Sequence, residues 1–124
     1  MLPVMSTAGN ILVAVVALLH LYFLVMEMFL WTKPFGRRAF GLTPEFAQAS
    51  RALAANQGLY NGFLAAGLIW SLLAEHPFDF YLKIFFLTCV IVAGIYGAVT
   101  VNRKIFWIQA APALVALVLI HFPH

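Results

Sequence analysis

The chain has 124 residues, which is enough for one domain, and 65% of them are apolar whereas only 9% are charged. A soluble domain of this length leaves much of its surface in water, so the composition excludes an ordinary soluble fold and predicts an integral membrane protein. The formal charge of +3 does not indicate nucleic-acid binding, because the few basic residues stand in short stretches between apolar segments.

Four stretches are long and apolar enough, or nearly so, to cross a bilayer as helices, for which about 20 apolar residues are needed. They cover residues 9–31, 52–74, 80–101 and 105–122. The predicted fold is all-α, a four-transmembrane-helix bundle that forms a single domain over residues 1–124. The last stretch is the shortest, and Pro112 is expected to kink its helix because proline lacks a backbone donor.

The three connections between these stretches differ in charge. Residues 32–51 carry four basic residues and one acidic residue, a net charge of +3. Residues 75–83 carry one basic and two acidic residues, a net charge of −1, and the third connection holds Arg103 and Lys104. The first and third connections must lie on the same side of the membrane, and basic loops stay in the cytoplasm. We therefore expect a multi-pass inner-membrane protein with both termini outside.

The first connection contains a helix start. Pro34 is expected to end the first helix, since the residue before a proline is pushed out of the helical region. Thr43 then suits an N-cap, with Pro44 at the first helical position and Glu45 in the first turn. A helix from Pro44 is expected to run into the second span as a short amphipathic cytoplasmic lead-in. It either covers the cytoplasmic mouth of the bundle or is a simple extension.

Polar side chains inside the apolar stretches are expected at one depth, in the cytoplasmic half. Glu27 follows His20 by seven residues, close to two helical turns, so both project from one side, roughly 10 Å apart along the axis. Trp31 caps that side one turn later. The other candidates come from the second, third and fourth helices, and they are Asn56, Gln57, Tyr60, Asn61, Tyr96 and Gln109. Since polar residues within a span mark a functional face or a packed interface, the sequence predicts a ligand-binding pocket here.

Glu27 and His20 are the candidate catalytic residues. A carboxyl group in this position could give up or take up a proton, or bind a cation or a cationic substrate. Alternatively, Glu27 locks the first helix to the second through an amide or a phenol. His20 either relays protons to Glu27 through a water or a substrate, or makes a hydrogen bond between helices. No metal-ligand spacing and no nucleotide fingerprint is present, so neither a metal nor a cofactor is predicted.

Gly58 and Gly62 form a GxxxG pair in the second stretch. Such pairs let two helices approach closely. The pair either serves packing within the chain or joins copies of the chain in a homo-oligomer.

Three runs of residues carry a family resemblance: His20–Arg38, Ala55–Gly67 and Ala93–Ala98. They resemble a family of small bacterial membrane proteins designated domain of unknown function 1304, and the resemblance covers nearly the whole chain. It implies an integral membrane location, surrounded by membrane lipids, and it implies no particular activity.

Three functions are compatible with these features. The first is binding of a small lipophilic ligand whose polar head meets Glu27, with proton transfer or isomerisation as the enzymatic version. The second is a proton-coupled exporter, by analogy with small multidrug transporters, although the firm charge bias of the loops disfavours subunits that insert in both orientations. The third is a structural or assembly partner that docks through the Gly58–Gly62 face.

Overall fold

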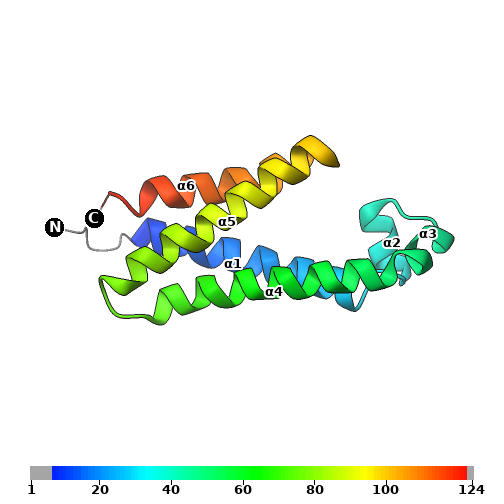
Figure 1. Cartoon of the computed structure of the whole chain (residues 1–124), viewed down its shortest axis with the longest axis horizontal. Helices are drawn as coiled ribbons and strands as arrows, with labels where there is room; N and C mark the ends of the chain where they lie inside the picture. Colours follow the sequence, from blue (N-terminus) through cyan, green and yellow to red (C-terminus); the bar gives the residue numbers. More distant parts are fainter. Residues whose placement is uncertain (1–6, 123–124) are drawn as a thin grey trace. The chain divides into compact units, whose positions relative to one another are not determined.

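The computed structural model describes residues 7–122, and this part of the chain consists of helices joined by short connections, without strands (Figure 1). The predicted all-α class is confirmed. The helices are α1 (Thr7–Met28), α2 (Pro34–Phe40), α3 (Pro44–Ala49), α4 (Arg51–Leu73), α5 (Phe78–Thr100), the π-helical segment η1 (Phe106–Ala110) and α6 (Ala111–Leu119). The charges of the connections predict that both chain ends are on the outer side of the membrane. The ends themselves lie outside the described residues.

Among the described helices, α1 and α5 are long and apolar enough to cross a membrane. α4 has 23 residues, but its polar side chains lower its hydropathy, and Phe106–Leu119 is a shorter apolar helix. The structure therefore supports two candidate spans where the sequence predicts four.

The chain divides into two compact units. Unit 1 comprises residues 7–17 and 66–122 of the described chain, and unit 2 comprises Leu18–Ala65. α1 and α4 contribute residues to both units.

Unit 2 contains a short helix, α2, that the sequence analysis does not predict. α1 already ends at Met28, and Pro34 begins α2 instead of merely ending the preceding helix. Gly36 lies within α2, and a Cβ at this position would collide with the backbone carbonyl oxygen of Leu30. Glycine therefore lets α2 pack directly against the segment that follows α1.

The predicted helix start at Thr43 is confirmed, but the lead-in does not run unbroken into α4. The Phe46 N–H donates to Thr43 Oγ1 at 3.1 Å, and Pro44 occupies the first helical position. α3 then ends at Ala49, and Ser50 leaves the helical conformation with φ −98° and ψ 5°. The Ser50 hydroxyl donates to the Phe46 carbonyl at 2.7 Å, a local bond by which serine competes with regular helix.

In unit 1, α5 packs against η1 and α6 (Figure 1). Gly94 of α5 allows the close approach, since a Cβ there would lie 2.7 Å from the backbone nitrogen of Ala110. The kink at Pro112 stays a prediction, and the structure has the π-helical segment η1 directly before α6, with Pro112 in the first turn of α6. There the Ala111 N–H donates to the carbonyl of Phe106, five residues back. A widened turn of this kind is one way in which a helix adapts to the donor that proline lacks.

Candidate functional site

A carboxylate–amide cluster in unit 2 joins the last turn of α1 to α4. Asn61 Nδ2 donates to Glu27 Oε1 at 2.6 Å, and Gln57 Nε2 donates to Glu27 Oε2 at 3.0 Å. Gln57 and Asn61 are four residues apart and so share one ridge of α4. Each carboxylate oxygen thus accepts one hydrogen bond from a neutral amide.

The cluster is buried at one side and open at the other. Glu27 and Asn61 are buried, with 7% and 8% of their surface exposed, whereas Gln57 is exposed. Among the described residues, no lysine, arginine or histidine forms an ion pair with Glu27. The carboxyl group is therefore held by neutral donors only, and Gln57 is the member that borders the surface.

The GxxxG pair explains why α4 comes so close to α1. A Cβ at Gly58 would lie 2.7 Å from Met28 Cγ and 3.1 Å from Glu27 Cβ. A Cβ at Gly62 would lie 2.7 Å from Leu24 Cδ1. The glycines thus serve packing within the chain, because they bring the Gln57–Asn61 ridge into reach of α1. A further role in joining two copies stays a prediction.

The second predicted ridge of α4 points elsewhere. Asn56 and Tyr60 are exposed, and in the described structure neither side chain hydrogen-bonds to Glu27. The Tyr60 ring contacts Phe63 edge-on, with centroids 5.7 Å apart. Of the four predicted α4 residues, the structure brings Gln57 and Asn61 to the carboxylate.

His20 and Trp31 lie on either side of the cluster along the chain. His20 is fully buried two turns before Glu27 on α1, and its ring contacts Phe23 edge-on at 5.3 Å. Trp31 Nε1 donates to Ser50 Oγ at 2.9 Å. Trp31 therefore ties the end of α1 to the junction between α3 and α4. No spacing rule pairs it with Ser50, nineteen residues later, so the sequence analysis missed this contact.

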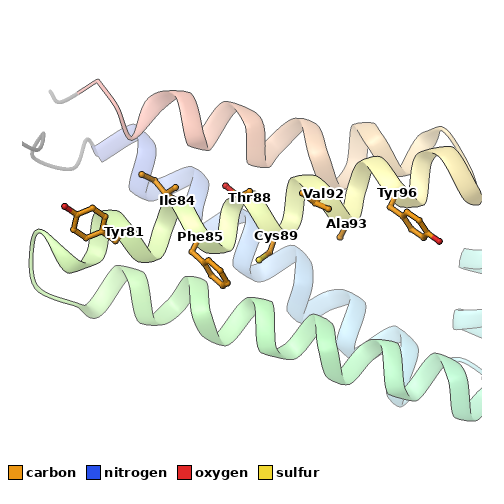
Figure 2. A pocket seen from close by; sticks show the side chains of 8 residues that line it. All are labelled: Tyr81, Ile84, Phe85, Thr88, Cys89, Val92, Ala93 and Tyr96. Carbon is orange, nitrogen blue, oxygen red and sulfur yellow. The ribbon is translucent and has the colours of Figure 1, made fainter.

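Two predicted site residues belong to unit 1. Gln109 is buried in η1. Tyr96 is exposed on α5, where it lies at one end of an apolar groove of about 750 Å³ that reaches to Tyr81 (Figure 2). Thr88 and Cys89 lie midway along this groove (Figure 2). Its apolar lining is typical of a helix face that contacts lipid.

A second polar cluster, at the start of α5, was missed. Lys83 Nζ donates to Asp79 Oδ2 at 3.1 Å, and His76 Nδ1 lies 2.9 Å from Asp79 Oδ1. Both members of the lysine–aspartate pair are buried. The sequence pattern places Asp79 before the predicted span 80–101 and Lys83 within it, whereas α5 begins at Phe78 and includes both members of the pair. The four-residue spacing of Asp79 and Lys83 was the available signal.

These observations define a small all-α protein with two helices able to cross a membrane and a buried carboxylate held by two amides. The chain belongs to the family described as protein of unknown function (DUF1304), which matches residues 14–121. The resemblance noted in the sequence is thereby confirmed. The chain is also 31% identical over 116 residues to the uncharacterized protein YpaA of Lactococcus lactis subsp. lactis (strain IL1403), and the match covers 92% of this chain and 97% of that protein. No solved structure matches the chain.

Proposed function

We propose that this protein is a four-span protein of the inner membrane, with both termini outside, that binds a small lipophilic ligand through Glu27. The lengths of α1, α4 and α5 and the basic first and third connections support the membrane arrangement. η1 and α6 together form the fourth, shortest span in this proposal.

The observation that carries the ligand proposal is the pairing of Glu27 with neutral donors alone. A buried carboxylate usually has a cationic partner, because burying an isolated charge is costly. Here the two partners are the amides of Gln57 and Asn61. A ligand with an amine or another proton-bearing head group would supply the charge or proton that the cluster lacks.

Gln57 offers the route by which a ligand reaches the carboxylate. Its side chain is exposed, and its 3.0 Å bond to Glu27 is longer than the 2.6 Å bond from the buried Asn61. Rotation of the Gln57 side chain would free Oε2 while Asn61 still holds Oε1. The apolar part of the ligand would remain in the lipid.

Conversion of the ligand is the enzymatic version of the same proposal. Once Gln57 has turned away, the Glu27 carboxyl group could remove a proton from one carbon or nitrogen of the ligand and return it to another. His20, two turns along α1, would then serve as a second proton-exchanging group through a bridging ligand or water.

Co-purification tests the binding proposal. Wild-type protein and the Glu27→Gln variant are purified in parallel in a mild detergent and compared by native mass spectrometry. Glu45→Gln is the matched control, because Glu45 is exposed on α3 and outside the cluster. We expect a bound small molecule on wild type and on Glu45→Gln but not on Glu27→Gln. Spectra without a ligand for all three proteins, or with the same ligand on all three, would contradict the proposal.

A further inference from the structure

We propose that Arg37 and Arg38 bind the phosphate group of an anionic membrane phospholipid at the C-terminal end of α2. This adds a second binding site to unit 2. It depends on the membrane location proposed above, and it does not depend on a ligand at Glu27.

A hollow of about 380 Å³ lies at the end of α2. Its lining residues are Pro34, Arg37, Arg38, Gly41 and Leu42. The chain turns at Gly41, which has φ 65°, and the Leu42 N–H donates to the Arg37 carbonyl oxygen at 2.8 Å. This arrangement closes a helix end, and it occupies the carbonyl groups of Arg37 and Arg38. The charged groups that line the hollow are therefore the guanidinium groups of Arg37 and Arg38.

In the described part of the chain, the two guanidinium groups form no ion pair, and one of their nitrogens is buried without an acceptor. The Nε atom of Arg37 is buried and has no hydrogen-bond partner within residues 7–122. Neither Arg37 nor Arg38 forms an ion pair with a carboxylate in the described part of the chain. A buried donor of a charged group is costly when it stays unpaired. Phosphate oxygens fit the planar fork of arginine in a bidentate manner, so a phosphate in the hollow would supply acceptors for the guanidinium groups that line it.

The surroundings of the hollow indicate that the phosphate belongs to a lipid. Phe35 and Phe40, on the same short helix, are 55% and 40% exposed. A helix that exposes aromatic and basic side chains together is typical of the membrane interface. The net charge of +3 over residues 32–51 favours an anionic headgroup over a zwitterionic one.

Lipid retention from nanodiscs tests this site. The full-length protein is placed in nanodiscs of equal parts phosphatidylglycerol and phosphatidylcholine, released, and examined by native mass spectrometry. We expect wild type to keep phosphatidylglycerol preferentially. In the R37Q/R38Q variant retention should fall by at least about tenfold, because the loss of even one charge-assisted hydrogen bond has an effect of this size. The control R103Q/K104Q removes the same charge from the other basic connection and should retain the lipid.

Two further comparisons distinguish the outcomes. Arg37→Lys keeps the charge and removes the fork, so it should also lose retention, and circular dichroism of each variant checks its helix content. Equal retention by wild type and R37Q/R38Q, or equal loss in R103Q/K104Q, would show that no specific site exists. Displacement of the lipid by inorganic phosphate, but not by chloride at matched ionic strength, would assign the site to free phosphate and overturn the lipid proposal. If the proposed membrane location is wrong, wild-type protein will not enter nanodiscs, and this will be evident before any lipid is measured.

Discussion

Replacing Asn61 by leucine should reveal how much the carboxylate–amide cluster contributes to stability. Leucine has the same number and branching of side-chain heavy atoms as asparagine, so the change removes a donor without opening a cavity. The lost bond is the 2.6 Å contact to Oε1 of the buried Glu27. Because hydrogen bonds to charged groups contribute about 1.5–3 kcal/mol, we expect the free energy of unfolding to fall by about 2 kcal/mol.

Two leucine variants on the same helix calibrate this value. Gln57→Leu removes a longer bond from an exposed residue and should cost about 0.5–1 kcal/mol. Asn56→Leu replaces an exposed asparagine that does not contact Glu27, and it should change stability by less than about 0.5 kcal/mol. The expected order of destabilisation is therefore Asn61, then Gln57, then Asn56.

Equilibrium unfolding in mixed micelles, followed by circular dichroism, measures these differences. A double-mutant cycle with Glu27→Met and Asn61→Leu isolates the interaction between these two side chains. The double variant should recover part of the stability that the single variants lose, and the coupling energy should be at least about 1 kcal/mol. Equal stabilities of Asn61→Leu and Asn56→Leu, or a coupling energy near zero, would refute the reasoning.

Three other predictions concern packing and pairing, and each is checked by the same unfolding measurement. Gly94→Ala should cost about 1–3 kcal/mol, because the new methyl group would lie 2.7 Å from a backbone nitrogen of η1, and an unchanged stability would contradict this. Asp79→Asn should cost about 3–5 kcal/mol, because it leaves the buried Lys83 ammonium without its carboxylate. Replacing both partners, by Asp79→Leu with Lys83→Met, should destabilise the protein much less. Similar losses of stability in the two variants would argue against a paired charge. Trp31→Phe and Ser50→Ala should each cost about 1 kcal/mol. The double variant should lose no more stability than the more harmful single variant, because both changes remove the same hydrogen bond. Additive losses would show that the two side chains act independently.

Helical spacing made the centre of the candidate site predictable. The spacing of seven residues from His20 to Glu27, and of four from Gln57 to Asn61, places side chains on common faces whatever the surrounding fold. The choice between the two neighbouring ridges of α4 was not predictable in this way. It depends on the contact of Gly58 with α1, which selects the ridge that carries Gln57 and leaves the other exposed.

The features that sequence reasoning missed depend on contacts between distant residues or on local competition for hydrogen bonds. The break between α3 and α4 arises at Ser50, whose hydroxyl donates to one neighbour and accepts from Trp31. The helix after Pro34 needs Gly36 to pack against Leu30. A periodic apolar pattern contains neither kind of information, since it records which face of a helix is apolar and not what that face meets.

The two buried acidic side chains find their partners at different stages of synthesis. Asp79 pairs with Lys83 one turn along the same helix, so in the proposed membrane arrangement α5 would enter the bilayer with this pair already neutralised. The amides that hold Glu27 follow it by 30 and 34 residues. If α1 spans the membrane as we propose, it would reach the bilayer before its partners have been made, and its carboxyl group would have to stay protonated, hydrated or at the surface until α4 arrives. In the four-span arrangement proposed above, α1 and α4 would therefore have to insert as a pair, whereas α5 would not depend on another helix for its charges.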